Sequence, residues 1–177
     1  MSKTILYQTV EDRDNADFVE QNGPFVCRRP DAWLGEGAYF WEKQIENAHF
    51  WGRKSYGTGK YIICQSSYES TAEDYFNLYG NTEHAETLEK CKRLLETRLP
   101  KNEIVLRKVI GFMVKTKVFP YKAIRIASHF YDRIFVTRKE YMLLPQLVQL
   151  CVIDNSFLID GEYKIVFPEE YVQGTTV

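Results

Sequence analysis

Short runs of β-branched and aromatic residues alternate along the chain with segments of helical periodicity. In the first half the strand-like runs are Ile5–Val10, Ala38–Trp41 and Tyr61–Ser66. Every residue of Ala38–Trp41 is apolar or aromatic, which predicts a strand buried on both faces. The C-terminal third adds five predicted strands: Ile124–Ala127, Arg133–Thr137, Leu147–Ile153, Ser156–Ile159 and Tyr163–Phe167. Asp160-Gly161 predicts a tight hairpin between the last two.

Helix signals fall mostly earlier in the chain. The clearest predicted helix is Thr82–Leu99, where apolar residues recur at three- and four-residue steps and Pro100 follows. Three shorter helices are predicted from Asp14 or Asn15 to Gln21, over Glu42–Trp51, and after the capping-box residues Ser70–Glu73. Asn102–Lys115 is compatible with a helix that continues into a strand, and the pattern does not separate the two.

Helices concentrated in the N-terminal half and strands in the C-terminal part predict the α+β class. A chain of 177 residues is long enough for one domain with a sizeable core. No repeat, linker or low-complexity segment divides it, so residues 1–177 are predicted to form a single domain.

Composition and charge narrow the possible partners. With 45% hydrophobic and 15% aromatic residues the chain is not simply disordered. Its net charge of −1 gives no general case for nucleic acid or membrane binding. Ten basic and two acidic residues nevertheless fall between Lys101 and Lys139, which leaves this segment at +8 and the rest of the chain at −9. A solvated basic surface is the simpler interpretation, and a phosphate-bearing partner is the alternative.

Targeting and metal signals are absent from the sequence. The four cysteines show no metal-binding spacing and the three histidines are scattered, so no metal site is expected. The N-terminus does not resemble a signal peptide, and no apolar run approaches the ~18 residues of a membrane span. We therefore expect no membrane partner and a reduced, cytoplasmic compartment.

An aromatic segment between Trp33 and Trp51 is the strongest candidate for chemistry. Six of its residues are aromatic: Trp33, Tyr39, Phe40, Trp41, Phe50 and Trp51. Tyr39 and Trp41 share one face of their predicted strand, and Phe40 takes the other. Two glycines precede the strand and allow the backbone to approach a ligand closely. Physical reasoning alone favours an aromatic core cluster, with a stacking surface for a flat heteroaromatic ring as the alternative.

The pattern Gly-x-Gly-x-Tyr-Phe over Gly35–Phe40, followed by a helix, resembles the nicotinamide-binding strand and helix of ADP-ribosyltransferases. The similarity is to the poly(ADP-ribose) polymerase branch. It implies split β-sheets and NAD as a substrate. It also implies that Tyr39 packs on the nicotinamide, with Phe50 on its other face, and that Asn47 stands where a serine meets the carboxamide. Gly37 and Trp51 complete this part of the implied pocket.

Two further segments occur in the order that the family shows. Leu6-Tyr7-Gln8-Thr9 resembles its Leu-Tyr-His-Gly strand, so Gln8 and Thr9 stand where a histidine holds the NAD ribose and a glycine follows. Gln146–Val152 resembles the strand of the catalytic glutamate, and Gln149 takes the position of the acid. A glutamine in this strand is a pattern associated with small bacterial members of the superfamily.

The departures leave three interpretations open. An active enzyme would cleave NAD and transfer ADP-ribose to a protein, a nucleic acid or water, with Gln149 or a spare carboxylate, Glu36 or Glu140, orienting the nucleophile. Glutamine lacks the charge that stabilises an oxocarbenium ion, which favours instead a non-catalytic module that binds NAD or ADP-ribose, or a protein. A structural domain whose aromatics are only core is the third interpretation.

Overall fold

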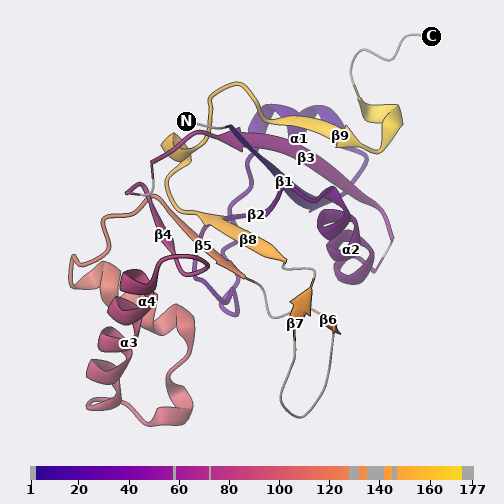
Figure 1. Cartoon of the computed structure of the whole chain (residues 1–177). Helices are drawn as coiled ribbons and strands as arrows, with labels where there is room; N and C mark the ends of the chain where they lie inside the picture. Colours follow the sequence, from indigo (N-terminus) through magenta and orange to yellow (C-terminus); the bar gives the residue numbers. More distant parts are fainter. Residues whose placement is uncertain are drawn as a thin grey trace.

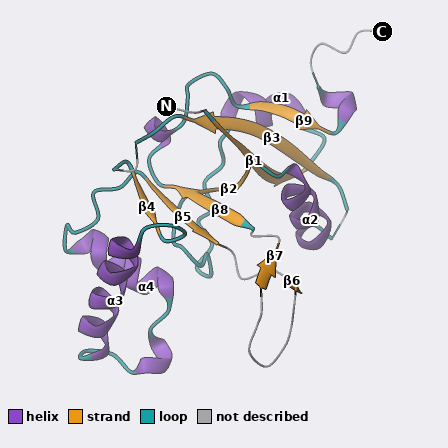
Figure 2. Cartoon of the chain, in the orientation of Figure 1, coloured by secondary structure: helices purple, strands orange, loops and turns teal. Residues whose placement is uncertain are grey.

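The computed structural model describes residues 3–57, 59–71, 73–127, 132–134, 142–144 and 147–172. It confirms the α+β class: a seven-stranded sheet carries helices on both faces (Figures 1 and 2). The strands of this sheet are β1 (Thr4–Glu11), β2 (Ala38–Glu42), β3 (Tyr61–Tyr68), β4 (Tyr75–Asn77), β5 (Ala123–Ala127), β8 (Val148–Val152) and β9 (Lys164–Phe167). A separate pair is formed by β6 (Asp132–Ile134) and β7 (Met142–Leu144).

The seven strands are ordered β4-β5-β8-β2-β1-β3-β9, and only the β4–β5 pairing is parallel. β1 pairs with β3 over its whole length but meets β2 at only two positions, Leu6↔Glu42 and Tyr7↔Trp41. The strands therefore form one continuous sheet, whose two halves are joined by a narrow seam between β1 and β2. The family resemblance implies two split sheets instead.

Alternation along β2 divides the side chains between the two faces of the sheet. Tyr39 and Trp41 lie on one face, which we call the Trp41 face, and Phe40 lies on the other, the Phe40 face. Residues directly opposite one another on paired strands share a face. The β2–β8 register pairs Tyr39 with Cys151 and Trp41 with Gln149, so both β8 residues belong to the Trp41 face.

Helices cover the Trp41 face in two places. Helix α2 (Ile45–Ser55) packs Ala48 beside Trp41 in one apolar cluster. Helices α3 (Thr82–Glu96) and α4 (Leu106–Lys115) lie together beyond β4 and β5 (Figure 1) and enclose a second cluster that includes Tyr39. Trp41 of the first cluster and Tyr39 of the second lie two residues apart on β2, the central strand of the sheet.

The Phe40 face is covered by helix α1 (Ala16–Asn22) and by the 3₁₀ turn Asn155–Phe157. Phe40 is fully enclosed there, and complete burial of such a side chain contributes about 1.5–3 kcal/mol. Because both faces are covered, β2 must be apolar on both sides, and the structure confirms the prediction of a doubly buried strand.

The structure confirms most predicted elements, corrects two, and decides one that the sequence pattern left open. No helix follows Ser70 in the described residues; the side chain of Asp74 accepts hydrogen bonds from Thr71, and strand β4 begins at Tyr75. Ser156–Ile159 is not a strand, because a 3₁₀ turn forms there and β9 pairs with β3 instead of making a hairpin. Asn102–Lys115 resolves into a 3₁₀ turn and α4, without a strand.

Two other predictions are confirmed only in part. Of the predicted strand Arg133–Thr137, residues 135–137 lie outside the described residues. The described α-helices lie between residues 16 and 115, so α4 falls in the second half of the chain and the expected concentration in the N-terminal half is incomplete.

Gly37→Ala is expected to lower the free energy of unfolding by about 1–3 kcal/mol. A Cβ atom at Gly37 would lie 2.5 Å from Cys151 Sγ and 2.8 Å from the Val152 carbonyl oxygen. The matched control is Gly111→Ala on α4, where a Cβ meets nothing within 4 Å and alanine should stabilise the helix by roughly 0.5–1 kcal/mol. Urea unfolding measures both, and equal effects of the two substitutions would contradict the prediction.

Candidate functional site

A row of side chains crosses the centre of the Trp41 face. The register places Ile126 opposite Gln149, Gln149 opposite Trp41, and Trp41 opposite Tyr7. Tyr7 and Ile126 keep partial exposure, whereas Trp41 is 3% and Gln149 is 8% exposed. The row thus crosses four strands, from β5 through β8 and β2 to β1, and its central pair, Trp41 and Gln149, comes from segments more than 100 positions apart in the sequence. It is the candidate site.

Gln149 is held by Trp33, which belongs to the aromatic segment noted in the sequence but not to the pocket that the family resemblance implies. Trp33, on the loop before β2, donates a hydrogen bond from its indole Nε1 to Gln149 Oε1 at 2.8 Å. The bond brings an aromatic ring to the row and uses the side-chain oxygen of Gln149. The sequence signals for Trp33 are its membership of the aromatic segment and its position beside the glycines of the loop, and neither identifies Gln149 as its partner.

Tyr39, which the family resemblance places against the nicotinamide, forms hydrogen bonds with the loop that precedes it. Its hydroxyl donates to the Gly35 carbonyl oxygen at 2.8 Å and accepts from the Leu34 amide at 3.1 Å. Gly35 has a φ of +98°, which permits the turn. Burial, followed by the nearby Cys151, raises the pKa of Tyr39, so its hydroxyl stays protonated. Its ring packs against the α3–α4 cluster, so Tyr39 shapes the loop that carries Trp33.

The three α2 residues of the implied pocket have different surroundings. Trp51 packs against Trp41, with ring centroids 6.4 Å apart, and so borders the row. Asn47 is buried, and its amide nitrogen donates to the Gln44 side chain at 3.4 Å. Phe50 is 41% exposed, with the Lys54 ammonium 5.7 Å from the ring centroid. Only Trp51 is placed beside the row by these contacts.

Gln8 lies on the Phe40 face, away from Gln149, because it neighbours Tyr7 on β1. Its amide nitrogen donates to the Phe25 carbonyl oxygen at 2.8 Å, and its oxygen accepts from the Phe25 amide at 2.9 Å and the Tyr163 hydroxyl at 2.8 Å. The side chain is 3% exposed. These contacts make Gln8 a structural glutamine that fastens the loop after α1, and the structure does not bring it together with Gln149.

Thr9 and Gly37 support the site from its edges. The Thr9 hydroxyl donates to the Ala48 carbonyl oxygen at 2.9 Å, which ties β1 to α2. Gly37 forms a β-bridge with Cys27 and lets the backbone pass close to Cys151. Neither residue offers a charged group to a ligand.

Tyr7 contributes a phenol that sequence reasoning did not assign to the site. Burial, followed by the charge of Glu46, raises the pKa of Tyr7, so its hydroxyl stays protonated at neutral pH. The sequence signal that could have identified Tyr7 is the alternation along β1, which places it and Gln8 on opposite faces.

The spare carboxylates and the basic segment do not complete the row. Glu36 is exposed and accepts a hydrogen bond from Arg28 at 2.8 Å, and Glu140 lies outside the described residues. Arg125, counted with the basic segment, forms a buried two-point ion pair with Glu42, with distances of 2.6 and 2.9 Å. The described part of the basic segment is therefore not one continuous solvated surface.

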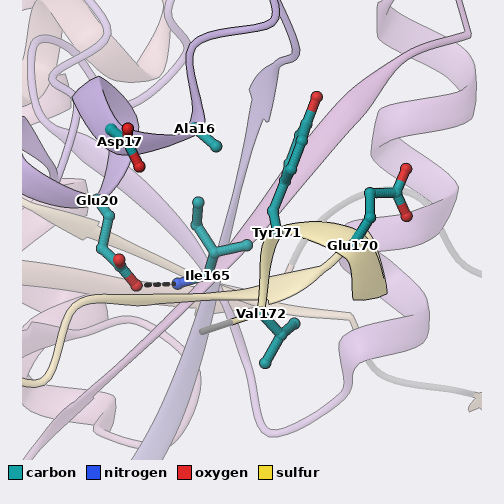
Figure 3. Close-up of a pocket in the computed structure, with 7 residues that line it drawn as sticks. All are labelled: Ala16, Asp17, Glu20, Ile165, Glu170, Tyr171 and Val172. Atoms are coloured by element: carbon teal, nitrogen blue, oxygen red, sulfur yellow. Dashed lines mark hydrogen bonds between the residues drawn. The ribbon is translucent and has the colours of Figure 1, made fainter. Parts of the chain in front are cut away.

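Figure 3 shows a hollow of about 220 Å³ between α1 and the end of β9. It is lined by Ala16, Asp17, Glu20, Ile165, Glu170, Tyr171 and Val172. Glu20 accepts a hydrogen bond from the Ile165 amide at 3.2 Å across it. The hollow adjoins α1, on the opposite side of the sheet from the row, and contains none of the residues predicted from the family resemblance.

No protein-family model, curated protein or solved structure matches this chain. Within the described residues, no helix combines the length and the apolar character needed to cross a bilayer.

Replacing Gln8 with alanine is expected to lower the free energy of unfolding by about 1–3 kcal/mol, because the Phe25 amide, the Phe25 carbonyl and the Tyr163 hydroxyl lose their partner. Gln65→Ala is the control, since Gln65 is a half-buried β3 residue that makes no side-chain hydrogen bond to a described residue. Chemical denaturation compares the two. Equal stabilities of Gln8→Ala and the wild type would show that these hydrogen bonds do not fasten the loop.

Proposed function

We propose that this chain is an ADP-ribosyltransferase-like domain that binds NAD, or its nicotinamide part, on the Trp41 face and has little transfer activity. The observation that carries the proposal is the register pair Trp41↔Gln149. The two segments identified separately by the family resemblance become direct neighbours on one face of the sheet. A fold of the ADP-ribosyltransferase type is part of the same proposal.

The composition of the row supports ring binding. Aromatic side chains stack on flat heterocycles, and a partly exposed aromatic surface contributes area at a low entropic cost. Tyr7, Trp33 and Trp51 each keep partial exposure around the more deeply buried Trp41 and Gln149. A nicotinamide ring placed here would contact indole and phenol rings and meet an amide.

The chemistry of the row supports binding over transfer. Cleavage of the nicotinamide–ribose bond develops positive charge on the sugar, and a carboxylate stabilises that charge. Gln149 is neutral, and its oxygen already accepts the Trp33 hydrogen bond. Among the described residues of the row none is acidic, and Glu46 on α2 is the carboxylate whose charge reaches Tyr7.

Ligand binding should raise the melting temperature of the wild-type protein by several °C at saturating NAD, because a ligand that binds only the folded state stabilises it. Tyr7→Leu should weaken binding roughly threefold to tenfold through loss of ring contact. Tyr79→Leu is the matched control, since Tyr79 packs against Arg125 and not in the row. An unchanged melting temperature with millimolar NAD, nicotinamide and ADP-ribose would refute the proposal.

Gln149→Glu should raise the rate of nicotinamide release from NAD by about tenfold or more, because it supplies the missing charge while still accepting the Trp33 hydrogen bond. Gln65→Glu is the control: Gln65 pairs with Tyr7 and places the same charge two strands beyond Trp41. Chromatographic detection of released nicotinamide measures the rate. A folded, NAD-binding Gln149→Glu variant no faster than Gln65→Glu would show that Gln149 does not occupy a catalytic position.

A further inference from the structure

The hydrogen bond from Trp33 fixes which way the Gln149 amide is turned. An indole N–H only donates, so the Gln149 atom that it meets at 2.8 Å must be the oxygen and not the nitrogen. Rotating the amide by 180° would set an N–H group against another N–H group at a site that is 8% exposed. The orientation of this amide is therefore chemically determined.

The fixed orientation leaves the Gln149 nitrogen as the group that a ligand can meet. This nitrogen makes no hydrogen bond to a described residue. Ser70 Oγ is the one described side-chain oxygen or nitrogen that is fully enclosed without a partner, so the Gln149 nitrogen keeps some contact with solvent on a residue that is 8% exposed. It carries two N–H donors and no acceptor.

We propose that Trp33 is a specificity-determining residue that makes the row select ring ligands with a hydrogen-bond acceptor over ring ligands with only a donor. The inference rests on the proposed function, in which the row binds a nicotinamide-type ring. Trp33 acts through Gln149: its hydrogen bond fixes the side of the amide on which the oxygen lies, and the N–H groups on the other side are presented to the substituent of the ring. A carbonyl oxygen accepts this hydrogen bond, whereas an amino group leaves two donors facing each other.

Two donors that face each other lower the affinity for the ligand by a measurable factor. A buried donor that loses its partner on ligand binding weakens that binding by about tenfold or more. Sites built to pair with one polar group discriminate strongly against analogues that lack it. Trp33 thereby fixes the orientation of a side chain that could otherwise present either its oxygen or its nitrogen to the ligand.

The test compares two analogues of NAD in which the carboxamide is replaced, one by an acetyl group that only accepts and one by an amino group that donates. Isothermal titration calorimetry gives Kd for each analogue and for NAD itself. The wild-type protein should bind NAD and the acetyl analogue within about threefold of each other, and the amino analogue about tenfold or more weakly.

Trp33→Phe keeps a ring but removes the N–H group, so the amide of Gln149 can turn. This variant should gain affinity for the amino analogue and bring the two analogues within about threefold. A gain of affinity is an outcome that general damage to the fold does not produce. Trp51→Phe is the matched control, since it changes an aromatic ring beside Trp41 without removing the Trp33–Gln149 bond, and it should keep the wild-type ratio.

Gln149→Glu should invert the preference, because a carboxylate only accepts. Equal binding of the two analogues by the wild-type protein, or a Trp33→Phe variant with an unchanged ratio, would overturn the role of Trp33 while leaving NAD binding intact. If the wild-type protein binds none of the three ligands (NAD, the acetyl analogue and the amino analogue), the proposed function and this inference are overturned together.

Discussion

The antiparallel pairing of β2 with β8 is the constraint on which the arrangement of the candidate site depends. It brings a segment near residue 40 and a segment near residue 150 into direct contact, and it decides which side chains share a face. Because β2 is central and packed on both sides, a slip of its register by one residue would move Phe40 and Trp41 to the opposite faces, where the surrounding side chains are arranged for other shapes. Gln149 is consequently held beside Trp41 as firmly as the core itself is packed.

Much of the fold was predictable from the sequence because its strongest signals are local. The all-apolar run of β2 and the periodicity of α3 depend on neighbouring residues, and both were correctly predicted. Ser70–Glu73 has the pattern of a helix start, yet the side chain of Asp74 accepts a hydrogen bond from Thr71 in a turn. The residues that follow form strand β4, which pairs with β5. Tertiary pairing overrode a local signal that was genuine but weak.

The candidate site was less predictable because its parts come from distant segments. The resemblance of short motifs singles out Tyr39 and Gln149 as positions of interest, but the partner of Gln149 is Trp33, 116 residues away in the chain. Nothing local predicts that bond. Gln8 differs from Gln149: its position in a family-like strand predicts ligand contact, while alternation along β1 places it on the other face, where it forms hydrogen bonds with Phe25 and Tyr163.

The seam between β1 and β2 has a mechanical consequence. Only two register pairs join the halves of the sheet, and one of them, Tyr7↔Trp41, belongs to the row. Any twisting of one half against the other therefore changes the spacing between Tyr7 and Gln149 more than it changes spacings within either half. A molecule bound across the row would connect the two halves of the sheet at the place where the fewest register pairs hold them together. Its binding would therefore make the whole domain stiffer.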